Sequence, residues 1–168
     1  ATVNGNTDRE LAITASIDHR DRGALSSIEG KATVRLAGAP WYDIDVTTKP
    51  VSLVEVGRFV PAAGLIGSAS GPVRLVGAPR NLHVDADLRL ADGGRFTTRG
   101  TLDLASREKG YDLAARLYTL NRRSVTTKGP VTSLNAVAMA RGRGFEPATM
   151  RATLAADLST SRWDSVAV

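Results

Sequence analysis

The sequence predicts an all-β fold: an antiparallel sheet of eight or more amphipathic strands, either curled into a groove or doubled into a sandwich. Three observations lead to this prediction. Apolar and polar residues alternate along most of the chain, as they do in strands with one dry face. Helical periodicity is nearly absent. Turn signals containing Gly and Pro separate the alternating stretches.

The first predicted strands are ELAITASID (10–18), ATVRLAG (32–38) and WYDIDVTTK (41–49), in which apolar residues occupy every second position. The Gly-Ala-Pro at 38–40 separates the second strand from the third, because proline cannot donate to a β-ladder. The stretch 50–71 that follows is apolar, Gly-rich and not cleanly alternating. We expect it to be a long connection that folds over the sheet or docks on another surface.

The clearest predicted strand is NLHVDADLRL (81–90), which follows a second Gly-Ala-Pro at 77–79. Five apolar residues share one face of it: Leu82, Val84, Ala86, Leu88 and Leu90. A tight hairpin at Asp92-Gly93-Gly94, where glycine supplies positive φ, leads into RFTTRGTLDL (95–104).

Three more alternating stretches complete the series: YDLAARLYTL (111–120), LNAVAMARG (134–142) and TMRATLAADL (149–158). The polar loop 106–110 precedes the first of them, and the basic stretch 121–133 is a second long connection. Each long connection follows a strand that begins with Tyr-Asp, and each precedes a Gly-Pro-Val segment.

These recurring motifs indicate a repeat with a period of roughly 70 residues. The Tyr-Asp at Tyr42 returns at Tyr111, and the break at Pro79 returns at Pro147. We therefore expect one repeat-built β domain over residues 1–168, with approximate units 28–70 and 71–140 and a partial unit 141–168. The alternative is chance similarity among short strands, which share a small alphabet of residues.

The amino-acid composition excludes or disfavours several kinds of site and partner. Aromatic residues make up 5% of the 168 residues, so a core must be built from Leu, Val, Ile and Ala. The net charge of +5 is spread singly along the chain, which favours solvated charge over a nucleic-acid surface. Cysteine is absent, which excludes disulfides, zinc–thiolate sites and a cysteine nucleophile. No apolar run is long enough for a membrane-spanning helix.

The sequence contains no set of residues with the spacing of a known catalytic or ligand-binding motif. His83 shares a strand face with Asp85 and Asp87, which is typical of a solvent-exposed face as well as of a metal site. His19 lies in the charged segment DHRDRG, where we expect a turn. Ser68 and Ser70 lack a nucleophile-elbow context, and a single RGRG at 141–144 is weak evidence for RNA binding. We expect a non-enzyme with no catalytic residue, no metal and no cofactor.

The stretch GPVRLVGAPRNLHVDADLRLADGGRFTTRGTLDL (71–104) resembles the repeats of TamB and the wider AsmA-like group of bacterial envelope proteins. GYDLAARLYTLN (110–121) and residues 129–163 are similar to the Tyr-Asp-Leu and Gly-x-Gly-x-x-Pro strands of that group. The resemblance covers roughly residues 28–165, and its motifs are degenerate. The group's membrane anchor and C-terminal domain have no counterpart here, so the resemblance implies a segment of a longer chain or a shortened relative.

The resemblance implies a long, curled sheet whose apolar face shields phospholipid acyl chains or assists outer-membrane assembly in the periplasm. The protein would then be a membrane-associated component of the cell envelope. The residues that we expect to line the apolar face, facing lipid or a core, share one parity of their strands: Leu82, Val84, Leu88, Leu113, Leu117, Leu154 and Leu158.

The alternative hypothesis is a structural accessory subunit that braces a larger membrane-protein complex on its periplasmic side. In that case the sheet would close into a sandwich, and the apolar connection and the strand-end aromatics would dock on the partner. The candidate docking residues are Trp41, Phe59, Leu65, Ile66 and Trp163. The expected partners are therefore acyl chains or a membrane-protein complex. An anionic membrane surface is a further candidate, and no nucleic acid is expected.

Overall fold

A computed structural model describes residues 2–6, 9–21, 24–58, 64–127, 130–144, 150–163 and 166–167. Most of these residues, 72%, lie in strands. The strands are β1 (Thr2–Asn6), β2 (Glu10–Asp21), β3 (Ala24–Arg35), β4 (Trp41–Ser52), β5 (Ser68–Ala78), β6 (Asn81–Leu90), β7 (Arg95–Asp103), β8 (Gly110–Leu120), β9 (Thr132–Arg143), β10 (Arg151–Leu158), β11 (Arg162–Trp163) and β12 (Val166–Ala167).

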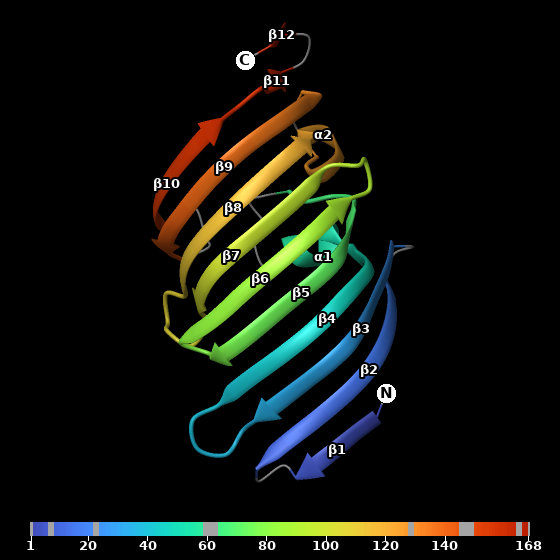
Figure 1. The fold of residues 1–168 in the computed structure, drawn as a ribbon, viewed down its shortest axis with the longest axis vertical. Coiled ribbons are helices and arrows are strands. Elements are labelled where there is room, and N and C mark those ends of the chain that lie inside the picture. Colours follow the sequence, from blue (N-terminus) through green and yellow to red (C-terminus); the bar gives the residue numbers. More distant parts are fainter. Residues whose placement is uncertain are drawn as a thin grey trace.

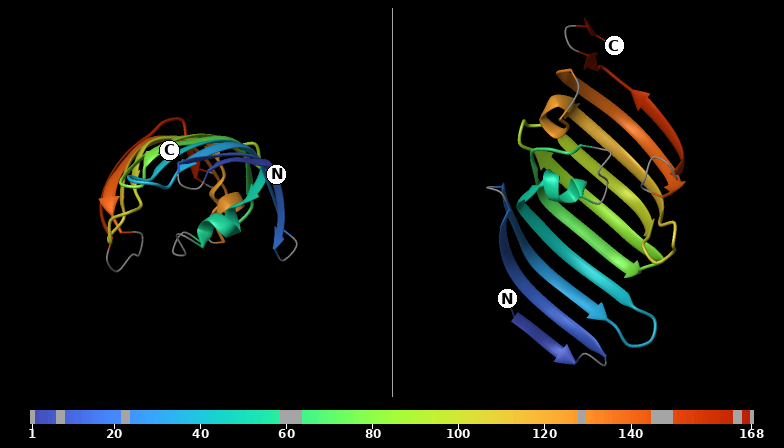
Figure 2. Two further views of the ribbon diagram at one scale, coloured as in Figure 1. Left: turned by 90° about the horizontal axis from the view of Figure 1, so that it is seen from below. Right: turned by 180° about the vertical axis from the view of Figure 1, so that it is seen from behind.

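The strands follow one another across a single antiparallel sheet in chain order from β1 to β10 (Figure 1). The short β11 pairs with the start of β9 and with β12. Within the described residues the sheet is not closed, and it has the shape of an arch when viewed along the direction in which the strands succeed one another (Figure 2). The prediction of an all-β, antiparallel fold is confirmed. Of the two forms that the sequence left open, the described residues adopt the curled one.

Glycines in β5 allow the neighbouring strand to approach closely. Gly71 has φ 145° and Gly77 has φ 131°, a backbone region that other residues rarely adopt. A Cβ atom on Gly71 would lie 2.0 Å from the carbonyl oxygen of Asp87, and one on Gly77 would lie 2.4 Å from that of Asn81. Glycine inside a strand is typical of a bend. The two glycines around PVRLV therefore contribute to the curl of the sheet.

Each of the two long connections contains a short helix that the alternation pattern did not predict. These are α1 (Leu53–Gly57) and α2 (Arg122–Val125). Helices of four and five residues are too short to show a period of 3.6 residues. Both helices lie beneath the arch (Figure 2). The two connections also join each other, because the amide of Ile66 donates to the carbonyl of Val125 and the amide of Thr127 donates to that of Gly64.

The helix α1 is tied to the sheet by a buried serine. The hydroxyl of Ser26 donates to Glu55 Oε2 at 2.8 Å and accepts from the amide of Ser52 at 3.0 Å. Ser26 is 3% exposed, and it lies 29 residues before Glu55 in the sequence. A five-residue helix is not stable by itself, so this contact positions α1 under the arch.

Replacing Ser26 with alanine is expected to destabilise this junction. The change leaves the amide of Ser52 and one oxygen of Glu55 without their partner, which costs about 1–3 kcal/mol. Urea unfolding measures the change in the free energy of unfolding. Ser27→Ala, at the half-buried neighbouring position, is the matched control and should change it by less than about 0.5 kcal/mol. Equal losses in both variants would contradict the role assigned to Ser26.

Candidate functional site

The apolar face of the sheet is its concave face. The side chain of Ser26 projects from β3 on the same side as Ile28 and Ala32, because residues two apart share a face. Ser26 contacts Glu55 of α1, and α1 lies inside the arch (Figure 2). The apolar side chains of β3 therefore point into the arch, and the register extends this assignment to the other strands.

Apolar residues continue across the sheet in register. One cross-strand row from β2 to β10 consists of Ile13, Ala32, Ile44, Leu75, Val84, Gly100, Leu113, Ala140 and Leu154. The rows beside it contain Leu82, Leu117 and Leu158. The register and the alternation place all seven predicted lining residues on this concave face, including Leu88, which pairs with Phe96. They come from three strands, β6, β8 and β10, and none of them lies in a loop.

Little of this concave face is buried by the protein itself. Only five apolar residues among those described are buried, and three of them are alanines: Ala69, Leu82, Ala86, Leu90 and Ala136. The chain exposes 11054 Å², whereas a compact monomer of this length exposes roughly 7,900 Å². Leu154 and Leu158 are 69% and 58% exposed. Within the described residues, no second sheet covers the apolar face.

The convex face carries paired charges. Arg99 bonds to Asp85, Arg95 to Asp87 and Arg141 to Asp112, each from a neighbouring strand. The hydrogen bond from Arg95 lowers the pKa of Asp87 below the ordinary carboxyl value. His83 is exposed on the same face. The carboxylates that could have joined His83 in a metal site are thus engaged by arginines, and no group of three metal-binding side chains occurs among the described residues.

His19 lies in strand β2, and the expectation of a turn there is wrong. The strand continues to Asp21 because its pairing with β3 extends beyond the alternating stretch. His19 Nε2 lies 3.4 Å from Glu55 Oε1, and Ser26 bonds to the other oxygen of the same carboxylate. In a hydrolase triad the histidine contacts the serine directly. Here the carboxylate stands between them, so the cluster gives Ser26 no general base.

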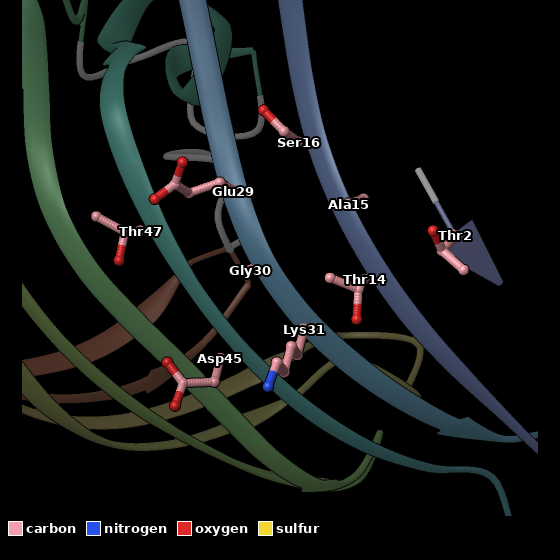
Figure 3. A pocket seen from close by; sticks show the side chains of 9 residues that line it. All are labelled: Thr2, Thr14, Ala15, Ser16, Glu29, Gly30, Lys31, Asp45 and Thr47. Carbon is pink, nitrogen blue, oxygen red and sulfur yellow. The ribbon is translucent and has the colours of Figure 1, made fainter. Parts of the chain in front are cut away.

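A hollow of about 610 Å³ lies on the convex face over β2, β3 and β4 (Figure 3). Its lining includes the hydroxyls of Thr14, Ser16 and Thr47. Lys31 and Asp45, which are register partners, add one charge of each sign. These groups continue the solvated pattern of the convex face, and we assign no chemistry to them.

The candidate docking residues have different environments. Leu65 forms a bridge to Thr126, and both Leu65 and Ile66 are half-buried at the junction of the two connections. Trp41 is half-buried beneath the guanidinium of Arg35, at 4.8 Å. Phe59 lies outside the described residues. Trp163 is described only as part of β11, paired with Thr132. Among the described side chains, Leu65 and Ile66 lie together at this junction, whereas Trp41 lies at the start of β4.

Neither α1 nor α2 has the length or the apolar character that a bilayer-spanning helix needs, and the described part of the chain contains no other helix. No protein-family model, curated protein or solved structure matches the chain.

Proposed function

We propose that the concave face shields the acyl chains of a lipid, as in the TamB and AsmA-like envelope proteins that the sequence resembles. The observation that supports this most is the uncovered apolar face. Monomeric proteins rarely leave a contiguous apolar surface larger than a few hundred Å² exposed to water. A face of this kind needs an occupant, and the protein is then a non-enzymatic component of the cell envelope.

The composition of the face favours an acyl chain over a protein as its occupant. Its rows are mainly aliphatic, with Leu, Val, Ile and Ala at most positions and aromatic rings only at Tyr42, Phe96 and Tyr111 among the described residues. Protein interfaces are instead enriched in aromatic residues, Met and Arg, and they use hydrogen bonds for specificity. An acyl chain offers neither charge nor hydrogen bonds and gains only from leaving water, at about 0.8 kcal/mol for each buried methylene.

The two faces of the sheet also differ in polarity, as a lipid-shielding sheet in water requires. Its convex face presents ion pairs such as Asp85–Arg99 to water, while its concave face presents the aliphatic rows. An arch of this kind keeps its outer surface hydrated while apolar cargo lies inside. The two connections beneath the arch cover part of the concave side near Ser26 and Ala69, and both of these residues are buried.

Mass spectrometry of the purified chain tests this proposal. The protein is expressed in bacteria, purified without detergent and extracted with organic solvent, and phospholipid is quantified against protein. We expect phospholipid to co-purify at about one molecule per chain or more, because the face spans several strands. A preparation free of lipid, whose concave face still binds no added phospholipid, would overturn the proposal. A stoichiometric protein partner in place of lipid would favour the accessory-subunit alternative.

A further inference from the structure

We propose that the convex face over β7, β8 and β9 is a docking site for an acidic polypeptide segment that presents a large apolar side chain. The site, called the β7–β9 patch below, consists of Arg95, Arg99, Arg116, Tyr118, Val137 and Met139. These residues line one hollow of about 570 Å³. It lies on the face turned toward the viewer in Figure 1, opposite the helices beneath the arch.

The β7–β9 patch interrupts the charge pattern of the convex face. One cross-strand row of that face alternates in sign through Lys31, Asp45, Arg74, Asp85 and Arg99. From β8 onward the same row becomes apolar, with Ala114, Met139 and Ala155. Folding does not require this change, because the convex side chains of β8 and β9 have no layer packed over them within the described residues.

Large side chains with apolar surface are exposed at the β7–β9 patch. Met139 is 65% exposed, Val137 49% and Tyr118 40%. The ring of Tyr118 lies 5.8 Å from the guanidinium of Arg95, which restricts its motion. Met, Tyr and Arg are among the residues enriched where proteins bind one another. The patch therefore combines arginines with exposed Met and Tyr side chains, as protein interfaces do.

The residues that line the hollow carry an excess of positive charge, which favours an acidic partner. Three arginines and one carboxylate, Asp85, line the hollow. Arg95 and Arg99 are held in place by bonds to Asp87 and Asp85. For Arg116, no carboxylate partner is found in the described residues. Planar guanidinium groups bind carboxylates in two-pronged geometry, and arginine clusters are a common mode of acidic-motif recognition.

The same observations argue against other occupants. An extended acyl chain would cover Arg116, whose guanidinium would lose hydration without gaining a partner, and would bring no bond to Arg95 or Arg99 beyond those to Asp87 and Asp85. A single-stranded nucleic acid gains much of its affinity by stacking successive bases on aromatic rings, and this patch has one such ring. An acidic segment with one apolar anchor pairs with the arginines and also covers Val137 and Met139.

The probe for this site is a capped nine-residue peptide with a central Leu between four Glu on each side, labelled with fluorescein. We expect saturable binding by anisotropy, weakened by added salt, and at least roughly fivefold weaker binding of the same peptide with Ser at its centre. Arg116→Gln and Met139→Ser should each weaken binding roughly tenfold. Matched controls are Arg20→Gln and Val54→Ser, which change an exposed arginine and an exposed apolar residue elsewhere.

Equal effects of the control variants would overturn the proposal, as would equal binding of the Ser-centred peptide or of a peptide with Lys in place of Glu. Vesicles of phosphatidylglycerol and a single-stranded oligonucleotide are competed against the peptide. If Arg116→Gln and Met139→Ser weaken vesicle or oligonucleotide binding and leave peptide binding unchanged, the acidic-segment assignment is wrong. Peptide binding is measured on lipid-extracted protein, so the measured peptide affinity does not depend on whether lipid binds to the concave face.

Discussion

Replacing Gly71 with alanine is expected to destabilise the sheet by about 3 kcal/mol or more, one of the largest effects of any single methyl group in this chain. The new Cβ would lie 2.0 Å from the carbonyl oxygen of Asp87, an atom of the backbone of β6 that no side-chain rotation can move. The φ of 145° adds strain for any residue with a Cβ. Relieving this clash would require β5 and β6 to separate near the centre of the sheet.

Urea unfolding followed by circular dichroism measures this effect. Gly110→Ala is the matched control, because the added Cβ would lie 3.3 Å from the side chain of Asp103 and nothing in the backbone blocks it. We expect the control to change the free energy of unfolding by less than about 1 kcal/mol. If Gly71→Ala is as stable as the control, the close approach of β6 to β5 does not hold in solution.

The second large effect is expected on lipid binding. Leu113 projects into the arch between Gly100 and Ala140, its register partners. An aspartate there would place a charge among the acyl chains, and the unpaired charge would lose hydration whenever lipid is bound. We expect Leu113→Asp to reduce phospholipid binding at least roughly tenfold. Displacement of a fluorescent fatty-acid analogue from the lipid-extracted protein measures the affinity.

The neighbouring residue provides the control for this variant. Ala114 lies on the convex face of the same strand, opposite Arg99. Ala114→Asp adds the same charge to the same strand, so its lipid affinity should match that of the original protein. The thermal unfolding temperature of both variants is measured first. Equal weakening by the two substitutions, in folded protein, would show that net charge and not the concave face governs lipid binding.

Strands β2–β4 and β6–β10 and their faces could be predicted from the sequence because they depend on local alternation. The alternation predicts no strand at β1, and it places the start of β5 in a long connection. Val84 and Leu88 were expected to share a face with Leu82, and the register of β5, β6 and β7 places them together. Alternation alone does not decide between a curled and a doubled sheet. That choice depends on contacts between neighbouring strands, such as the approach of β6 to Gly71.

The remaining features depend on residues that lie far apart in the chain. Ser26 and Glu55 carry no shared motif, and only the folding of the connection over the sheet brings them within hydrogen-bonding distance. The β7–β9 patch escaped prediction for a related reason. Val137 and Met139 appear as ordinary members of an alanine-rich strand, and only the register places them beside Arg116 and Arg99.

The most direct test of the central proposal, that lipid lies against the concave face, is photo-crosslinking from two adjacent positions. A benzophenone amino acid replaces Leu113 in one sample and Ala114 in another, and each is illuminated in the presence of phospholipid vesicles. Mass spectrometry of the intact protein then detects lipid adducts. We predict adducts from position 113 and none above background from position 114. Adducts of equal yield from both positions, or from position 114 alone, would contradict the proposal.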